Sequence, residues 1–152
     1  MKNNPSVAVL LSAYNGISWI EEQVASIICQ KNTSIEIFIS VDLSNDKTYE
    51  WCQDFAKENV NINVLPYGER FGGAAKNFFR LIRDVDLSYF DYISLSDQDD
   101  VWDSEKLSHA IRAIEQDDLD GYSSDVTAFW SNGREKLVKK SSPQKKLDYF
   151  FE

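Results

Sequence analysis

Apolar residues in the first hundred positions fall into short continuous runs separated by helical stripes. The runs are residues 7–12, 35–41, 62–65 and 92–96, and each has the length of a buried strand. Between them, apolar side chains recur every three or four residues, as in an amphipathic helix. Alternating strands and helices predict an α/β fold with a mainly parallel sheet, and right-handed crossovers put helices on both of its faces.

Four helices are expected between and after these strands. Ser18 and Glu21 have the spacing of a capping box at the start of the first helix. The second helix spans residues 48–58, and Ser104 is the expected cap of the last. The apolar stripes of the first, third and last helices are Ile20, Val24, Ile27 and Ile28, then Phe78, Leu81, Ile82 and Val85, then Leu107, Ala110, Ile111 and Ile114.

The last part of the chain has a weaker pattern. A fifth extended segment is expected within residues 122–130, and beyond Asn132 the sequence indicates loop and helix. We therefore divide the chain into a principal domain of residues 1–130 and a closing segment of residues 131–152.

Composition limits the class of protein. The 152 residues suffice for one domain with a core, and a content of 43% hydrophobic and 13% aromatic residues excludes a disordered chain. No apolar run reaches the roughly 18 residues of a membrane helix. The first residues lack a signal-peptide cleavage site, so we expect a cytoplasmic protein.

The distribution of charge bears on the expected partners. A net charge of −9 argues against binding to a nucleic acid backbone. Residues 134–152 depart from this average, because they hold six basic and three acidic side chains. Such a segment can touch phosphates or the anionic inner face of a membrane, and it can equally be a solvated stretch, which we prefer.

Polar clusters stand directly after three of the four predicted strands. They are Tyr14-Asn15, residues 42–46 and residues 97–100. In parallel sheets, ligands bind in the crevice beyond the carboxyl ends of the strands. Scattered surface residues would not fall at these positions three times, so the sequence predicts one binding site at this edge.

Asp97 and Asp99 belong to a run of three carboxylates within four residues. Alternate side chains at a strand end point the same way, so the two could share Mg²⁺ or Mn²⁺, which bridge carboxylates to phosphate oxygens. The alternative is a solvated acidic turn that caps the next helix. An EF-hand calcium loop is excluded, because Val101 and Trp102 occupy positions that need an oxygen ligand and a glycine.

Three other places could contact a nucleotide. Asp42 could accept a hydrogen bond from a base or a ribose. Tyr14 and Asn15 offer an aromatic face and an amide, and Lys76 adds a cation to a helix start preceded by two glycines. Each is also an ordinary turn or loop feature. The glycine patterns of ATPases and of dinucleotide-binding folds are absent.

In series, four stretches resemble the family 2 glycosyltransferases of the GT-A fold, a Rossmann-like architecture. The resemblance runs from Val7 to about Phe129, and its last stretch is closest to the rhamnosyltransferase-like branch. The four stretches are Leu11-Ser12-Ala13-Tyr14-Asn15-Gly16, Val41-Asp42-Leu43-Ser44-Asn45-Asp46-Lys47-Thr48, Gly72-Gly73-Ala74-Ala75-Lys76-Asn77 and Leu95-Ser96-Asp97-Gln98-Asp99-Asp100-Val101-Trp102.

The resemblance implies roles for individual residues. Ser12, Tyr14 and Asn15 match the turn that touches the base and ribose, and Asp42 matches a base-binding Asp. A valine and a leucine flank Asp42 where the family usually has Asp and Gly. Lys76 and Asn77 match the helix start near the diphosphate. Asp97 and Asp99 match the Asp-x-Asp pair, in which Asp99 would be the direct metal ligand.

The implied function is that of the donor-binding part of a metal-dependent, inverting glycosyltransferase. Its partners would be a UDP- or dTDP-linked sugar and a glycan or lipid-linked acceptor in bacterial surface polysaccharide synthesis. The general base is expected beyond Glu152, in a C-terminal half that this chain lacks. Its absence would expose apolar surface near Phe129 and Trp130 and favour self-association. A non-catalytic nucleotide-sugar-binding or scaffold protein of the same fold remains the alternative.

Overall fold

The computed structural model describes residues 4–139, which form two compact units that divide between His109 and Ala110. This division comes earlier than the boundary at residue 130 that the sequence pattern indicates. Every residue proposed for the nucleotide site belongs to the first unit.

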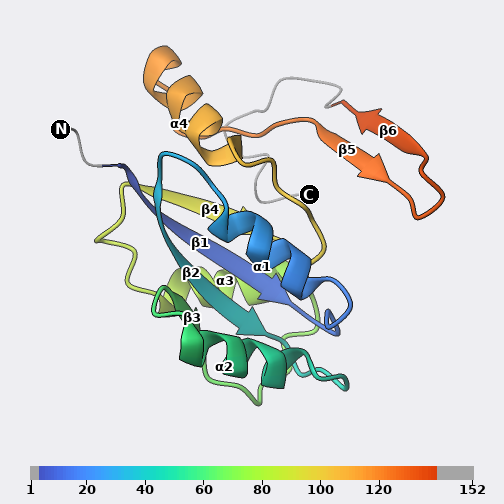
Figure 1. Cartoon of the computed structure of the whole chain (residues 1–152). Helices are drawn as coiled ribbons and strands as arrows, with labels where there is room; N and C mark the ends of the chain where they lie inside the picture. The colour runs from blue at the N-terminus through green and yellow to red at the C-terminus, as the bar shows by residue number, and fades with distance from the viewer. Residues whose placement is uncertain (1–3, 140–152) are drawn as a thin grey trace. The chain divides into compact units, whose positions relative to one another are not determined.

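The first unit contains a four-stranded parallel sheet, as predicted (Figure 1). Its strand order is β3-β2-β1-β4, with β1 paired to both β2 and β4. Because β1 is central, the turn after it lies between the turns after its two neighbours. The strands are β1 (Ser6–Ala13), β2 (Ser34–Val41), β3 (Ile62–Val64) and β4 (Tyr92–Ser96).

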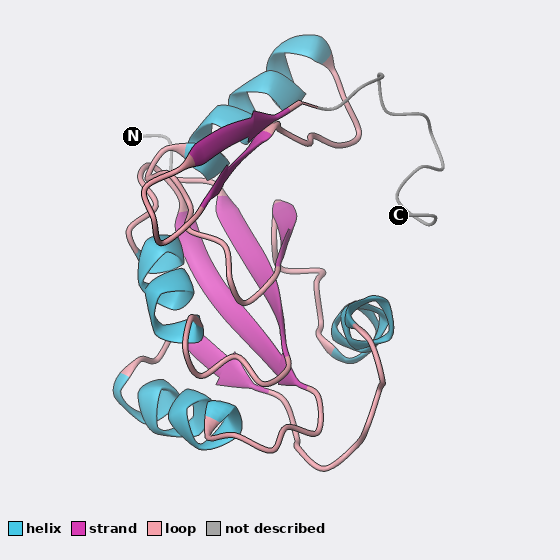
Figure 2. Cartoon of the chain, turned by 90° about the vertical axis from the view of Figure 1, so that its right-hand side faces the viewer, coloured by secondary structure: helices cyan, strands magenta, loops and turns pink. Residues whose placement is uncertain are grey.

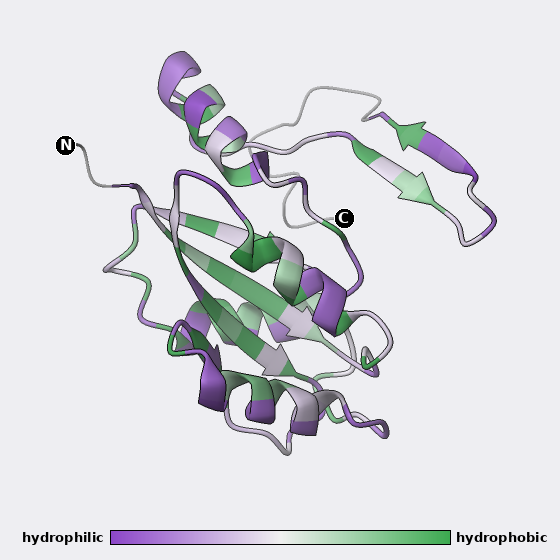
Figure 3. Ribbon diagram, viewed as in Figure 1, coloured by the Kyte–Doolittle hydropathy of each residue, from purple (hydrophilic) through white to green (hydrophobic). Residues whose placement is uncertain are grey.

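Helices cover both faces of this sheet, which confirms the predicted layers. Helices α1 (Ile20–Ile28) and α2 (Thr48–Glu58) lie on one face, and α3 (Ala74–Asp84) lies on the other (Figure 2). Apolar residues are concentrated along β1 and β2, between the helix layers (Figure 3). On the α3 face, Leu10 packs with Leu81 and Val85 in one buried cluster.

The start of α1 differs from the sequence-based expectation. The capping box of Ser18 and Glu21 is wrong, because no side chain caps this helix. Instead, the carbonyl of Gly16 accepts hydrogen bonds from the N–H groups of Trp19 and Ile20, both at 2.9 Å. The preceding turn therefore replaces the side-chain cap.

The apolar stripes of α1 and α3 are also modified. Ile28 and Ile82 are 49% and 47% exposed, although both were expected to be buried. On α1 the buried face includes Gln23. On α3 it includes Asn77 and Arg80. Polar side chains thus occupy positions where the helices meet hydrogen-bonding groups of neighbouring strands and loops.

Helix α4 (Lys106–Asp117) crosses the division between the units. At its start the side chain of Asp103, not the expected Ser104, accepts a hydrogen bond from the N–H of Glu105 (2.8 Å). The main-chain carbonyl of Asp103 accepts another from Lys106 N (3.0 Å).

The second unit contains a β-hairpin. Strand β5 (Val126–Phe129) is the expected fifth extended segment, and it pairs antiparallel with β6 (Glu135–Val138). The expectation of loop and helix beyond Asn132 is therefore wrong for residues 135–138. Phe129 and Trp130 are 59% and 44% exposed. Within residues 4–139, every helix is too short or too polar to cross a membrane.

Candidate functional site

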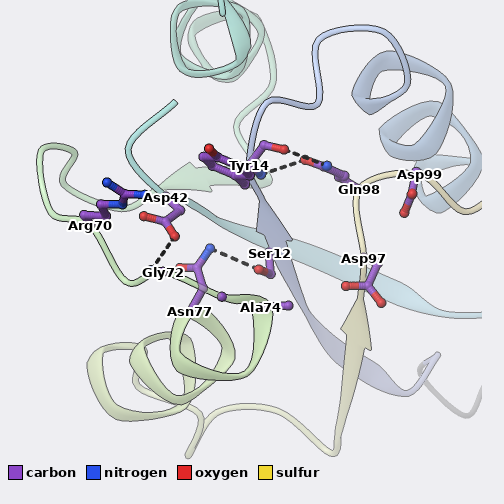
Figure 4. Close-up of a pocket in the computed structure, with 11 residues that line it drawn as sticks. Ser12, Tyr14, Asp42, Arg70, Gly72, Ala74, Asn77, Asp97, Gln98 and Asp99 are labelled. Carbon is purple, nitrogen blue, oxygen red and sulfur yellow. Dashed lines mark hydrogen bonds between the residues drawn. The ribbon is translucent and has the colours of Figure 1, made fainter. Parts of the chain in front are cut away.

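A cavity of about 610 Å³ opens at the carboxyl ends of β1, β2 and β4, beside the start of α3 (Figure 4). Asp42 and Arg70 stand on one side of it, Asp97 and Asp99 on the other, and Tyr14 between them. Its lining consists of Ser12, Tyr14, Asp42, Arg70, Gly72, Gly73, Ala74, Asn77, Asp97, Gln98 and Asp99.

The cavity brings together most of the side chains that the sequence singled out. Among the expected site residues, Asn15 and Lys76 alone are absent from its lining. Arg70 and Gln98 line it as well, although the sequence analysis did not select them. A basic residue next to a glycine pair was the available indication for Arg70, whereas nothing local distinguished Gln98.

Asp42 uses both carboxylate oxygens to hold the loop before α3. Its Oδ1 accepts hydrogen bonds from the N–H groups of Leu43 (2.7 Å) and Phe71 (2.8 Å). Its Oδ2 accepts one from Gly72 N–H (2.8 Å). Gly72 has a φ of 74°, a conformation that glycine adopts without strain.

The environment of Asp42 favours its ionised form. Burial raises the pKa of this carboxyl group, but the hydrogen bonds from Phe71, Gly72 and Leu43 oppose burial and bring the pKa below its ordinary value. The side chain is only 4% exposed. A fixed negative charge therefore lies in the cavity wall under the glycine loop.

Asn77 connects α3 to the two central strands. Its amide nitrogen donates to Ser12 Oγ (3.0 Å) and to the carbonyl of Ser40 (2.8 Å), and its amide oxygen accepts from Ser40 Oγ. The side chain is 1% exposed. All the hydrogen-bonding capacity of the amide nitrogen is thus used within the protein, and Asn77 fixes the helix start.

Arg80 continues this buried network one turn later. It donates to Ser40 Oγ (2.9 Å) and to the main-chain carbonyl of Pro66, and its guanidinium stacks over Phe71 at 5.0 Å. Its Nε lies 3.5 Å from Asp84 Oδ2. The guanidinium therefore ties the loop after β3 to α3.

Asn15 joins the turn after β1 to the turn after β2. It has a φ of 47°, and its side-chain oxygen accepts a hydrogen bond from Asn45 N–H (2.9 Å). Its own N–H donates to Ser44 Oγ (3.0 Å). In the same place Gly16 N–H donates to Thr48 Oγ1 (2.8 Å). Asn15 thus shapes one wall of the site from outside the cavity.

The acidic turn after β4 presents a different kind of carboxylate. Asp97 and Asp99 are exposed, and among residues 4–139 neither carboxylate accepts a hydrogen bond from the protein. Although Asp97 is accessible to solvent, partial burial raises its pKa, and the nearby carboxylates of Asp100 and Asp99 raise it further. These oxygens are available for a ligand.

The described residues do not form a closed metal site. Within residues 4–139 no group of three or more His, Cys, Asp or Glu side chains is placed to hold a metal ion. Asp97 and Asp99 could supply only part of a coordination shell, and a cation here would need oxygens from another molecule.

The fold and this site agree with the relationships of the sequence. Residues 8–151 match the family model described as glycosyl transferase family 2. The chain belongs to this family. Its fold is the GT-A fold that the sequence resemblance predicted, since the solved structures it matches are GT-A glycosyltransferases.

Two curated glycosyltransferases are similar to this chain. The chain is 50% identical over 143 residues to the dTDP-rhamnosyl transferase RfbG of Shigella flexneri, which covers 93% of this chain and 50% of RfbG. It is 31% identical over 104 residues to TuaG of Bacillus subtilis, a glycosyltransferase named for teichuronic acid biosynthesis. This match covers 68% of this chain and 39% of TuaG. The chain thus spans half or less of these relatives.

Two solved structures share the fold at low sequence identity. S. aureus TarS 1-349, in complex with UDP-GlcNAc, has a TM-score of 0.63 at 18% identity, and the match covers 84% of this chain and 41% of the TarS 1-349 chain. The mannosyltransferase PcManGT from Pyrobaculum calidifontis, in complex with GDP-Man and Mn²⁺, has a TM-score of 0.63 at 22% identity. This match covers 72% of this chain and 32% of the PcManGT chain.

Proposed function

We propose that this chain is the donor-binding part of a metal-dependent, inverting glycosyltransferase. The intact enzyme would transfer a sugar from a nucleoside diphosphate to a glycan or lipid-linked acceptor in bacterial surface polysaccharide synthesis. The observation that carries the proposal is the cavity, where two exposed carboxylates, a half-exposed tyrosine ring and a guanidinium line one space at the carboxyl edge of the sheet. A nucleoside diphosphate with its cation has complementary groups.

Asp99, helped by Asp97, is proposed to hold Mg²⁺ or Mn²⁺. The donor set fits, because hard cations prefer carboxylate oxygens, and these two carboxylates have no protein donor among residues 4–139. Two carboxylates are too few for a dedicated protein site, which agrees with a site shared with phosphate oxygens. When bound, the cation would supply positive charge for the leaving nucleoside diphosphate.

The opposite wall is proposed to receive the diphosphate. Arg70 lines the cavity with a guanidinium, whose planar N–H groups suit phosphate oxygens. Gly73 and Ala74 line the start of α3, where the helix N-terminus favours anions. Lys76 would add charge from outside the lining, and Asn77 would act by holding the helix start in place.

The nucleoside is proposed to lie between Tyr14 and Asp42. The ring of Tyr14 is 50% exposed and could stack on a base. Asp42 already accepts three main-chain hydrogen bonds, so about one of its roughly four acceptor positions remains for a ligand. Ser12 and Asn15 would complete this side, Ser12 from the lining and Asn15 by shaping the turn.

The donor is proposed to be dTDP-linked, with a UDP-linked sugar as the second choice, because RfbG is named as a dTDP-rhamnosyl transferase. We propose that the acceptor site and the general base belong to the part of the longer relatives that this chain does not match. That base would remove the proton of the acceptor hydroxyl during in-line attack on the anomeric carbon. A cytoplasmic site at the inner membrane face would suit a lipid-linked acceptor.

Calorimetric titration tests the proposal. Wild-type chain is titrated with dTDP and with UDP, each with and without Mn²⁺, beside Asp99→Asn and the exposed control Asp117→Asn. We expect Mn²⁺ to tighten nucleotide binding by roughly 5–150-fold in the wild type and in the control. Asp99→Asn removes the ligand charge with little change of shape and should abolish most of this effect.

The outcomes separate the readings. If Mn²⁺ still tightens nucleotide binding fully in Asp99→Asn, the acidic turn is only a solvated helix cap. Nucleotide binding without any transfer by a full-length relative that keeps these residues would favour the non-catalytic binding protein.

A further inference from the structure

Gln23 is a fully buried amide on the face of α1 that meets the acidic turn. Its side chain is 0% exposed, although a helix packed on a sheet normally buries apolar residues there. Burial of an amide is costly unless its hydrogen bonds are satisfied. Its partners therefore show what the position requires.

The partners of Gln23 stand at both ends of the acidic run. When the amide is oriented so that both of its ends have partners, its oxygen accepts hydrogen bonds from Ser96 Oγ (2.6 Å) and from the indole N–H of Trp102 (3.2 Å). The amide nitrogen donates to the main-chain carbonyl of Asp100. One side chain thus contacts Ser96, which precedes the acidic run, Asp100, which ends it, and Trp102, which follows two positions later.

Two further polar residues extend this face of α1 and its end. The N–H of Trp102 donates to Ser26 Oγ (3.0 Å). Gln30 donates to the carbonyl of Asp103 (2.5 Å) and accepts from Leu107 N–H (2.9 Å). Gln23 and Ser26 are three residues apart on one face of α1, and Gln30 follows two residues after the helix ends, so the segment after β4 is held along its length.

The acidic turn needs such a support because its charges repel one another. Asp97, Asp99 and Asp100 lie within four residues, so three carboxylate charges are held close together. Among residues 4–139, no main-chain N–H donates to these three carboxylates, in contrast to Asp42. Main-chain contacts from behind can oppose this repulsion without occupying the carboxylate oxygens.

We propose that Gln23 is a positioning residue for the acidic turn: it holds the main chain of residues 96–102 so that Asp97 and Asp99 are presented to the cavity before a cation or nucleotide arrives. The inference rests on the proposed function, because it assigns Gln23 to the same site. It adds a residue that acts from α1 without touching the ligand.

Two variants remove the contacts from either side. Gln23→Met keeps the length of the side chain and removes its hydrogen bonds. Trp102→Phe keeps an aromatic ring and removes the indole donor together with part of the buried ring. Ile27→Val is the matched control, because Ile27 is also 0% exposed on α1 and contributes no hydrogen bond to the turn.

Binding is measured as nucleotide affinity with and without Mn²⁺, and as Mn²⁺ affinity in saturating dTDP. Gln23→Met should weaken Mn²⁺ binding by roughly 10-fold or more, as outer-shell substitutions do. Metal-free dTDP affinity should stay within about twofold of the wild type, since the base and diphosphate contacts are retained. Trp102→Phe should act in the same direction and add little to Gln23→Met, because both belong to one network.

Hydrogen exchange of ligand-free protein supplies a readout that involves no metal. The N–H groups of residues 97–103 should exchange faster in Gln23→Met than in Ile27→Val when the two are compared at equal global stability.

The outcomes are distinguishable. If the nucleotide affinity of the wild-type chain does not change with Mn²⁺, the proposed function is overturned and this inference with it. A wild type that responds to Mn²⁺, together with a Gln23→Met variant that keeps both the response and slow exchange at the turn, overturns the inference alone.

Discussion

Gln98 pairs with the main chain of Tyr14 through both ends of its amide. Tyr14 N–H donates to Gln98 Oε1 (2.7 Å), and Gln98 Nε2 donates to the carbonyl of Tyr14 (2.8 Å). Gln98 is the middle residue of the Asp97–Asp99 run, so the acidic turn is attached to the turn after β1. A β-carbon at Gly16 would lie 2.1 Å from Gln98 Oε1, which explains a glycine at that position.

A double-mutant cycle tests this attachment. Gly16→Ala should push the Gln98 amide away from Tyr14, and Gln98→Ala should remove it, so each should weaken dTDP binding by roughly 3–10-fold, the equivalent of about one hydrogen bond. The double variant should lose no more than Gln98→Ala alone, because the collision disappears with the side chain. Calorimetric Kd values measure the cycle, and additive losses would contradict a shared cause.

Asp42 should make stability depend on pH. Its folded-state pKa is below the ordinary value: burial raises it, and hydrogen bonds from Phe71 and Gly72 more than compensate. The stabilisation it provides is therefore present above the unfolded pKa of about 3.9 and is lost as the pH falls through the folded value. Asp42→Asn should cost about 1–3 kcal/mol at pH 7.

The measurement for Asp42 is urea unfolding between pH 3 and pH 7. The difference between wild type and Asp42→Asn should shrink below about pH 4, because the carboxyl group then takes up a proton in the unfolded state before it does so in the folded state. The exposed Asp117→Asn serves as control and should change the free energy of unfolding by less than about 0.5 kcal/mol. A difference that is constant across this range would show that the charge of Asp42 is irrelevant.

Arg70 and Lys76 can be compared as phosphate-binding cations. Arg70 lines the cavity and Lys76 does not, so Arg70→Ala should weaken dTDP binding by roughly 10-fold, about the value of one charge-assisted hydrogen bond. Lys76→Ala should cost about threefold or less and lose that effect in high salt, because it acts only at long range. If the two variants lose equal dTDP affinity at 0.5 M salt, Lys76 contacts the phosphates directly.

Arg80 is expected to matter for stability. It is 7% exposed and supports Ser40 and the carbonyl of Pro66, so Arg80→Leu should lower the free energy of unfolding by about 2–3 kcal/mol by leaving buried groups unpaired. Arg83→Leu, on the same helix, removes an exposed guanidinium that also contacts Asp84 (2.6 Å). That control should change stability by less than about 0.5 kcal/mol, and thermal unfolding of both variants checks the contrast.

The sequence by itself determined the order of strands and helices in the first unit and the edge at which the site forms. Continuous apolar runs mark β1 and β2 because both faces of these strands are buried under helices. The polar residues directly after the strands, such as Asp42 and Asp97, could be assigned to one edge because parallel strands end on the same side. These features depend on neighbours along the chain, so the local pattern of apolar and polar residues predicts them.

Only the tertiary structure decided which polar residues face inward. Gln23 meets the segment after β4 from 73 residues earlier in the chain, and Gln98 meets Tyr14 across 84 residues. Helical periodicity tells which side of α1 is buried, but not whether a sheet or a loop lies across from it. A sheet accepts apolar side chains and a loop exposes main-chain N–H and carbonyl groups that need partners, so the Gln23 amide is buried where the chain brings a loop against α1.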